Sequence, residues 1–375
     1  MITFSDNIAR KPYLGSTEIA EVWLGNVKVY PDTPIDYSTQ YLTFEVVEGG
    51  TIEFVATDAS VSKTISYSLD DGQTWTDLTT STSYQPMGGT LSAGDKVLVK
   101  GKNNTYVSND MGFYNHFAST AKINVYGNIM SLISGDNFIN NKTLTGINTF
   151  YRLFADNARL LSAKNLILPA TKLTNYCYAY MFWNCANFKT APAILPATTL
   201  ADYCYSYMFS TCTNLTTAPV LPATTMAQWC YNFMFFGCTS LVTAPVLSAT
   251  TLAGNCYSHM FQNCTSLETA PVLPATTLAN QCYSGMFFGC TNLTTAPVLP
   301  ATTLANYCYT QMFYNCTKLN YIKAMFTTTP SNTYTQNWVT GVAASGTFVK
   351  NSAASWNVTG VNGVPTGWTI QRASS

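Results

Sequence analysis

The sequence predicts a mainly β protein with short helices, in which an N-terminal β hairpin and a β-sandwich precede a solenoid of stacked repeats. Three observations carry this prediction. A unit of about 26 residues recurs six times between residues 166 and 319. Alternating apolar and polar runs recur between residues 42 and 126, and two short β runs with Leu-Gly steps lie near the start. A fixed period in the twenties indicates a solenoid, and alternation indicates half-buried strands.

Each repeat combines a Thr-Ala-Pro-Val-Leu-Pro-Ala-Thr-Thr-Leu run with a Cys-Tyr-x-x-Met-Phe-x-x-Cys block. One step is 27 residues, where Ile194 is inserted, and the later steps are 26. This period falls in the leucine-rich-repeat range. One unit cannot bury its apolar face alone, so we expect neighbouring units to stack around a continuous core.

The i, i+4, i+8 spacing of Leu200, Cys204 and Met208 predicts a helix over residues 199–212. A short strand at 215–218 should then pair with its equivalent in the next unit, about 4.8 Å away. On a helical wheel, one half turn holds residues that nearly every copy keeps, and we expect these to be buried: Leu173, Cys177, Tyr178, Met181, Phe182 and Cys185. The other half varies between copies and should face outward: Asn175, Tyr176, Ala179, Tyr180 and Trp183.

The outward columns are rich in aromatic residues, which offer apolar rings and, in tyrosine, a hydroxyl at low entropic cost. This pattern predicts a binding surface on the outward helix face. Its aromatic anchors are Tyr176, Tyr180, Trp183, Tyr203, Tyr207, Trp229, Phe233 and Phe236. The alternatives are that these rings cover a neighbouring subunit or vary on a tolerant surface. Changes at Lys189, Val242 and Glu268 would test the opposite, strand-side face.

Charged residues make up only 10% of the chain, and the net charge is zero. Between residues 166 and 317 only Lys172, Lys189, Asp202 and Glu268 are charged. This composition excludes the basic footprint of a nucleic-acid binder and suits an uncharged or weakly charged partner such as a glycan. No apolar run is long enough to cross a membrane. We expect no catalytic residues and no cofactor, and we therefore expect that the protein is not an enzyme.

Four segments are expected. Residues 1–37 form an N-terminal hairpin too small to fold alone, which is expected to pack on its neighbour or dock on another protein through Leu14, Trp23 and Leu24. Residues 38–127 form the sandwich, 128–326 the solenoid and 327–375 a C-terminal cap with tryptophans over the last coil. Residues 149–160 are a degraded copy, whose charges Arg152, Asp156 and Arg159 should face solvent in an N-terminal cap.

Strands are predicted at 42–47, 51–56, 64–69, 96–100 and 121–126, which together imply a β-sandwich of immunoglobulin (Ig-like) type. Residues 68–75, Ser-Leu-Asp-Asp-Gly-Gln-Thr-Trp, match the Asp-box of sialidases. That motif is a hairpin turn in which the aspartate caps backbone amides, the glycine takes a positive φ and the tryptophan packs beneath. It carries no catalysis.

The twelve cysteines form two columns, 177, 204, 230, 256, 282, 308 and 185, 212, 238, 264, 290, 316. If a helix joins the two cysteines of one repeat, they are too far apart for a disulfide. Buried free thiols are the simplest interpretation, with inter-coil disulfides as the alternative. A metal site is not expected, because His116 and His259 lie far apart and the thiols point into a packed core.

The repeat pattern resembles the BspA-like leucine-rich repeats over about residues 127–375. Residues 127–132 (Gly-Asn-Ile-Met-Ser-Leu) and 363–368 (Gly-Val-Pro-Thr-Gly-Trp) resemble flanks in the gut-bacterial and phage branch of that family. The Leu-Gly hairpin with Val-Tyr-Pro also looks like N-terminal segments of phage structural proteins. The resemblance implies a BspA-type leucine-rich-repeat solenoid in an adhesin or a virion protein, without catalytic residues.

The start of the chain lacks the apolar core of a signal peptide, so we expect it not to be exported by the usual route. Together with the resemblance, this predicts a phage virion structural protein, a fibre or decoration protein that displays the solenoid for host attachment. Its expected partners are other virion proteins and a host-surface glycan or protein, without nucleic acid or membrane insertion; homo-oligomerisation is left open. The alternative is a secreted bacterial surface adhesin whose signal peptide is missing.

Overall fold

The computed structural model describes residues 36–108 and 111–373, together with five short strands within residues 1–30. The chain divides into two compact units, Met1–Tyr37 and Ser38–Ser375. Strands far outnumber helices in the described residues, so the predicted mainly β class is confirmed. Among those residues the helical segments are short: α1 (Ser131–Ser134), α2 (Asn332–Thr335) and three 3₁₀ turns at Tyr37–Thr39, Ala59–Val61 and Gly135–Asn137.

The first unit contains two small antiparallel groups of strands. β1 (Ile2–Phe4) pairs with β2 (Pro12–Leu14), which pairs with β3 (Thr17–Glu18). β4 (Val22–Leu24) and β5 (Val27–Tyr30) form a separate hairpin. Leu14 ends β2, and Trp23 and Leu24 lie in β4, so the leucine of each Leu-Gly step is the last residue of a strand. Docking through these three residues stays a prediction, because their side chains lie outside the described part of the structure.

The second unit begins with antiparallel strands at all five predicted positions. These are β6 (Leu42–Glu48), β7 (Ile52–Ala56), β8 (Thr64–Ser68), β10 (Lys96–Gly101) and β12 (Lys122–Asn128). Two further strands, β9 (Thr76–Thr79) and β11 (Asn115–Ser119), were not predicted, because one is a largely exposed edge and the other carries few β-branched residues.

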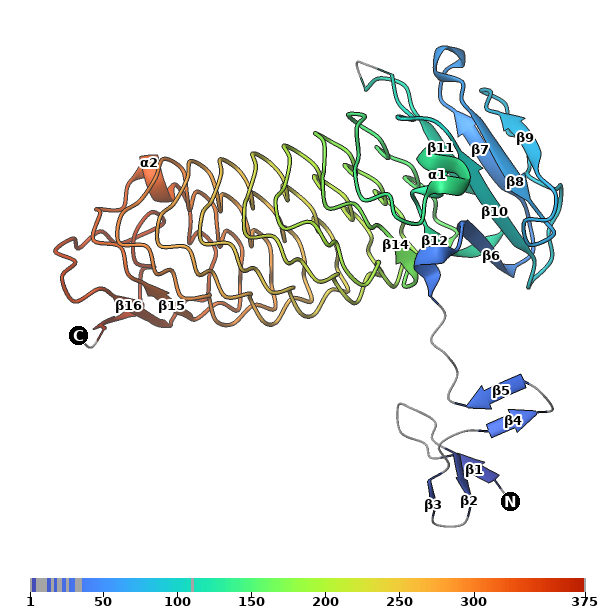
Figure 1. Ribbon diagram of the computed structural model, residues 1–375. Coiled ribbons are helices and arrows are strands. Elements are labelled where there is room, and N and C mark those ends of the chain that lie inside the picture. The colour runs from blue at the N-terminus through green and yellow to red at the C-terminus, as the bar shows by residue number, and fades with distance from the viewer. Residues whose placement is uncertain are drawn as a thin grey trace. The chain divides into compact units, whose positions relative to one another are not determined.

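These strands form two sheets (Figure 1). The larger sheet has the order β13-β12-β6-β10-β8-β9, and β11 pairs with β7 in the smaller one. Phe117 on β11 lies 4.7 Å from Phe44 on β6 and 4.5 Å from Phe54 on β7, measured between ring centroids. The phenyl rings of both sheets therefore share one core.

The sheet continues directly into the repeats. β12 pairs in parallel with β13 (Leu160–Ser162) and β14 (Leu166–Ile167), which belong to the first coils. A single cluster of buried hydrophobic residues runs from Leu42 in β6 to Trp368 near the C-terminus. The expected sandwich and repeat segments thus have a common hydrophobic core.

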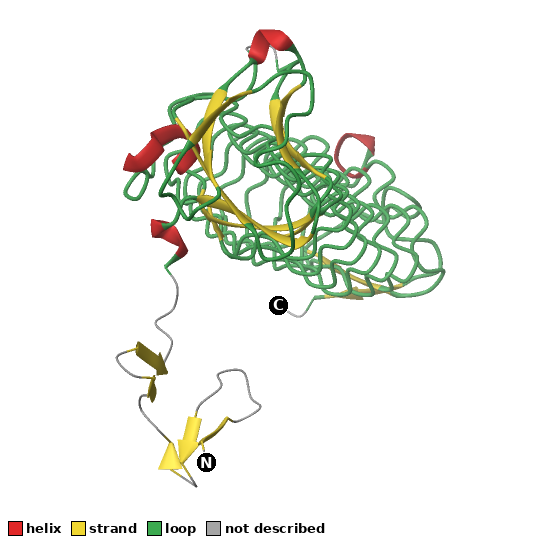
Figure 2. Ribbon diagram, turned by 90° about the vertical axis from the view of Figure 1, so that its right-hand side faces the viewer, coloured by secondary structure: helices red, strands yellow, loops and turns green. Residues whose placement is uncertain are grey.

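The helix predicted over residues 199–212 is wrong. This segment consists of successive turns, and loops and turns make up nearly all of the coils in Figure 2. Successive backbone amides along this segment and its equivalents alternate between two kinds of hydrogen-bond acceptor. Cys177 and Ala179 N–H donate to carbonyls three residues earlier, whereas Tyr178 and Tyr180 N–H donate to Cys204 and Ser206 in the next coil. The true period is four residues, which explains the i, i+4, i+8 series without a helix.

The strand predicted at 215–218 is reduced to isolated contacts. Thr190 forms a single parallel bridge with Thr217, and the Thr216 amide donates to the Lys189 carbonyl. Proline follows two residues later, at Pro219 and its equivalents, and cannot donate to a ladder. The strand side of each coil is therefore extended but interrupted.

The stack continues past the last recognisable repeat. Tyr309, Gln311 and Phe313 N–H donate to carbonyls of residues 334, 336 and 338. β15 (Tyr321–Ala324), β16 (Thr347–Lys350) and β17 (Thr369–Arg372) pair in parallel at this end. Trp338 is fully buried against Tyr309 and Phe313, as expected of a tryptophan that closes the core.

The residues predicted to face inward lie directly above their equivalents, and all of them are buried except Leu173, which is half-buried. Tyrosines of the inner column, from Tyr178 to Tyr309, stack with centroids 5.6–6.2 Å apart, and the phenylalanines from Phe182 to Phe313 stack at 5.5–5.8 Å. Ala179, expected to face outward, is buried instead. Its equivalents Ser206 and Asn232 donate side-chain hydrogen bonds to backbone carbonyls of the following coil.

All twelve cysteines are buried and unbridged. Each thiol of the second column donates to a phenylalanine carbonyl in the preceding coil, for example Cys212 Sγ to Phe182 O at 3.0 Å. Burial raises the pKa of Cys177 to about 12, so the thiol stays protonated. In the degraded copy, Asn157 replaces the cysteine, and its amide donates to Phe117 O on β11. Each residue of the second cysteine column, and Asn157 in its place, thus supplies a buried side-chain hydrogen-bond donor.

The inner tyrosines generate a stability prediction. The Tyr257 hydroxyl is buried and has no hydrogen-bond partner among the residues that the structure describes. Tyr257→Phe therefore removes an unsatisfied polar group and should leave the free energy of unfolding unchanged or raise it by up to about 1 kcal/mol. In the matched control, Tyr106→Phe, the lost hydroxyl donates to Leu132 O at 2.6 Å. That change should cost about 1–3 kcal/mol. Chemical denaturation measures both, and equal losses in the two variants would contradict the assignment.

Candidate functional site

The outward turn of each coil is built on residues with left-handed backbone. In the first full repeat these are Tyr176, Tyr180 and Asn184, with φ of 57°, 58° and 58°. The third of these columns reads Asn, Thr, Gly, Asn, Gly, Asn, largely the types that tolerate positive φ. The first two columns instead carry aromatic rings in the early coils. A bulky residue in this conformation costs about 1–2 kcal/mol, so another interaction must stabilise it.

That interaction is ring stacking between coils. Tyr176 stacks on Tyr203 at 4.4 Å between centroids, and Tyr203 on Trp229 at 5.8 Å. The second column stacks in the same way, at 4.5–4.7 Å: Tyr180, Tyr207, Phe233 and His259. Together these two stacks are called the outer ladder. Each stacked pair contributes about 0.5–1.5 kcal/mol beyond its buried area, which offsets the strained backbone.

The structure brings all eight predicted anchor residues together. Six belong to the outer ladder, while Trp183 and Phe236 lie edge-on against Tyr180 and Phe233 at 6.3 and 5.7 Å. None of the eight is fully exposed; each is half-buried. Because neighbouring rings cover much of each face, the ladder presents mainly ring edges and phenolic hydroxyls. Burial raises the pKa of Tyr180 and Tyr207, so these hydroxyls remain protonated donors at neutral pH.

The ladder also begins earlier than the sequence predicts. Arg152, expected as a solvent-facing charge of the cap, has φ of 56° and occupies the position of Tyr180 in the degraded copy. It is half-buried among aromatic rings rather than solvated. Asp156 and Arg159 are exposed, as predicted. The sequence signal that identifies Arg152 is its spacing of four residues from Asn148 and Asp156, which repeats the spacing of the three turn columns.

The strand side forms a second candidate surface. Its constant aliphatic column is exposed, with Val246 and Val272 showing 75% and 77% of their surface: Ile194, Val220, Val246, Val272 and Val298. Constant threonine pairs beside this column are also exposed, whereas the neighbouring column of Lys189, Val242 and Glu268 varies. Burial does not account for the constancy of this valine column, and nothing else in the structure explains it.

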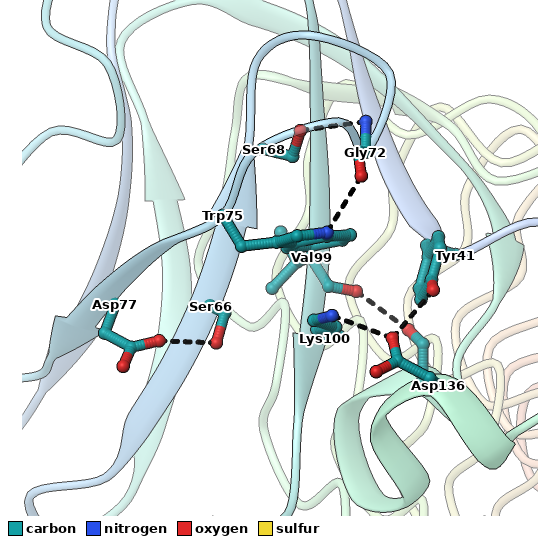
Figure 3. A network of polar contacts seen from close by, with 10 residues as sticks. Tyr41, Ser66, Ser68, Gly72, Trp75, Asp77, Val99, Lys100 and Asp136 are labelled. Atoms are coloured by element: carbon teal, nitrogen blue, oxygen red, sulfur yellow. Dashed lines mark hydrogen bonds and ion pairs between the residues drawn. The ribbon is translucent and has the colours of Figure 1, made fainter.

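A pocket of about 430 Å³ lies on the larger sheet, between β8, β10 and residues 135–136. Lys100 Nζ lies 2.7 Å from Asp136 Oδ1 and 4.0 Å from the Trp75 ring centroid, and the Tyr41 hydroxyl donates to the same carboxylate (Figure 3). The Lys100 hydrogen bond, followed by that of Tyr41, lowers the pKa of Asp136. These polar groups therefore bind one another.

The Asp-box turn has the predicted structural role. The Asp70 carboxylate accepts hydrogen bonds from Thr74 N at 2.9 Å and Thr74 Oγ1 at 2.6 Å, which lower its pKa to about 2. Gly72 has φ of 89°, and Trp75 Nε1 donates to the Gly72 carbonyl, as Figure 3 shows. The motif thus shapes the turn between β8 and β9.

The described residues hold no group of three or more His, Cys, Asp or Glu side chains placed to share a metal ion. No helix in the same part of the chain is long and apolar enough to span a bilayer. Comparisons with protein-family models, curated proteins and solved structures find no match. Of the two candidate surfaces, the outer ladder is the stronger, because its residues vary between copies on a constant backbone while the strand-side valines do not vary.

The two histidines predict a pH dependence. Burial lowers the pKa of His259 and of His116 below the usual 6.5, so the unfolded chain binds protons that the folded chain does not. The stabilisation from neutral histidine is full above pH 6.5, and it is lost as the pH falls toward each folded pKa. The free energy of unfolding should therefore decrease between pH 7 and 5, before the carboxylates titrate.

Denaturation midpoints at pH 7, 6 and 5 measure this slope. His259→Gln should reduce it without loss of fold, because Gln311 occupies the same column with nearly the same φ. Adding His116→Gln should abolish the slope. An unchanged slope in the double variant would assign the pH dependence to other groups.

Proposed function

We propose that this protein is a non-enzymatic adhesion protein that binds a host-surface glycan or protein through the outer ladder and its flanking Trp183 and Phe236. The observation that carries the proposal is the contrast between columns. Inner positions stay constant over six copies, while the outer positions change between aromatic and polar side chains on the same backbone. A surface that varies on a fixed scaffold is suited to recognition.

The chemistry of the ladder supports a carbohydrate partner. Ring edges provide apolar contact, protonated tyrosines donate hydrogen bonds, and residues 166–317 carry only four charges. Uncharged hydroxyl-rich ligands need this combination of apolar surface and a few polar groups. The equal spacing of successive coils would also match a ligand with repeating units.

We further propose that the coils form a leucine-rich-repeat solenoid of the BspA-like type and that the two sheets form an Ig-like sandwich. In this proposal the protein is a fibre or decoration protein of a phage virion, made in the host cytoplasm. Residues 1–37 would bind other virion proteins through Leu14, Trp23 and Leu24. The separate N-terminal unit supports such a docking role. The alternative is a BspA-like adhesin on a bacterial surface.

The binding test uses substitutions that other copies already carry. The triple variant Trp229→Asn, Tyr207→Gln and Phe236→Gln introduces the residues found at 255, 311 and 262 in the same columns. It should keep the fold, measured by circular dichroism, and lose at least ten-fold in affinity for glycans that the wild type binds on an array of bacterial and mucin oligosaccharides. The exposed-face control Val246→Thr should bind like the wild type.

The opposite result, loss of binding in Val246→Thr with normal binding in the triple variant, would move the site to the strand side.

The location of the protein is tested separately. Mass spectrometry of purified virions should detect the chain as a stoichiometric component. Detection only on bacterial cell surfaces would favour the adhesin alternative.

A further inference from the structure

Arg152 lies at the first position of the outer ladder, ahead of Tyr180 in the same left-handed column. Its guanidinium carbon lies 4.7 Å from the Trp183 ring centroid and 5.0 Å from that of Tyr180. Tyr114 and Tyr151 contribute two more rings, at 5.3 and 5.7 Å. Four aromatic rings from the sheet domain and two successive coils thus surround one half-buried cation.

Among the described residues, the Arg152 guanidinium has few hydrogen-bond partners. Arg152 Nε and Nη1 donate to the hydroxyls of Tyr151 and Tyr114, both at a long 3.4 Å. Five N–H donors are available on an arginine, so most of its capacity remains. Within residues 36–108 and 111–373, ion pairs join Lys100 to Asp136 and Lys122 to Glu48, and none involves Arg152. Asp156, one turn further, accepts from Asn184 instead.

A half-buried cation that pairs with no carboxylate of the described residues needs compensation. Each cation–π contact contributes about 0.5–2 kcal/mol. All four ring centroids lie within 4.7–5.7 Å of the guanidinium carbon. A carboxylate is the ligand that matches two parallel N–H groups of arginine. The ring edges of Trp183 and Tyr180 beside it offer apolar contact to a sugar ring.

We propose that Arg152, Trp183 and Tyr180 form a subsite for a carboxylate-bearing sugar, a uronate or a sialate, at the first end of the outer ladder. This inference rests on the proposed function, since the subsite is part of the same surface. It assigns the ligand class: an oligosaccharide that places one acidic residue on Arg152 and its neutral residues along the ladder. The alternative is a purely structural role, in which Arg152 covers the first ring of the ladder by cation–π contact.

The test compares matched acidic and neutral probes on the full chain. The uronate arm uses trigalacturonate and its methyl ester, and the sialate arm uses 3′-sialyllactose and lactose. Wild-type protein should bind one acidic probe at least ten-fold more tightly than its neutral partner in titration calorimetry. Arg152→Gln should remove that preference and keep the binding of neutral probes. Glutamine is tolerated in this column, because Gln311 occupies the equivalent position.

Arg152→Lys keeps the charge but not the two-pronged geometry, so it should retain only a minor part of the preference. A wild type that binds neutral and acidic probes equally, or Arg152→Gln that keeps the preference, overturns the subsite and leaves the proposed function intact. Equal binding of dextran sulfate also overturns it, because that result reflects attraction of any anion. Failure of every glycan, neutral or acidic, would overturn both this subsite and the carbohydrate partner in the proposed function.

Discussion

The hydrogen bond between successive coils is the interaction on which the rest of the structure depends. Every second amide of the outward turn donates to the next coil, as Tyr178 does to Cys204, while the amides between them close local turns. A single coil therefore leaves half of these donors unsatisfied, and each coil needs its neighbour. Buried unpaired backbone groups are costly, so the stack must begin on a ready partner. Strand β11 provides it, since the Phe117 amide donates to the Leu153 carbonyl and the Phe117 carbonyl accepts from the Asn157 side-chain amide.

This pairing also decides what the side chains can do. Because equal positions lie above one another, any aromatic column becomes a stack of rings, inside the core at Phe182 and outside it at Tyr180. The inner stacks account for constancy by burial. The outer stacks stabilise a left-handed backbone that large residues otherwise avoid, and they leave ring edges and hydroxyls at the surface. If the outer ladder binds a partner as proposed, recognition and stability are coupled on this face, and substitutions borrowed from other copies are the cleanest probes.

Much of this architecture can be predicted from the sequence, because the copies of the repeat can be compared with one another. The period, the buried columns and the five strands can be predicted from the spacing of apolar residues alone. The helix was wrong because residues four apart differ by only about 40° on a helix, so two turns of apolar spacing do not distinguish it from a four-residue turn. Hydrogen bonds between coils decide the matter, and spacing does not reveal them. Arg152 was missed because a charge in a degraded copy suggests solvent, whereas its environment comes from Tyr114, distant in sequence.

Hydroxyl-radical footprinting tests the central claim, that the outer ladder is the binding surface, because the radicals oxidise accessible aromatic side chains directly. With the tightest-binding oligosaccharide present, oxidation should fall at Tyr176, Tyr203 and Trp229, while the exposed valines of the strand side stay as reactive as in the free protein. Protection of the residue 216–225 and 242–251 segments, with the ladder rings unchanged, would contradict the account and place recognition on the valine and threonine face.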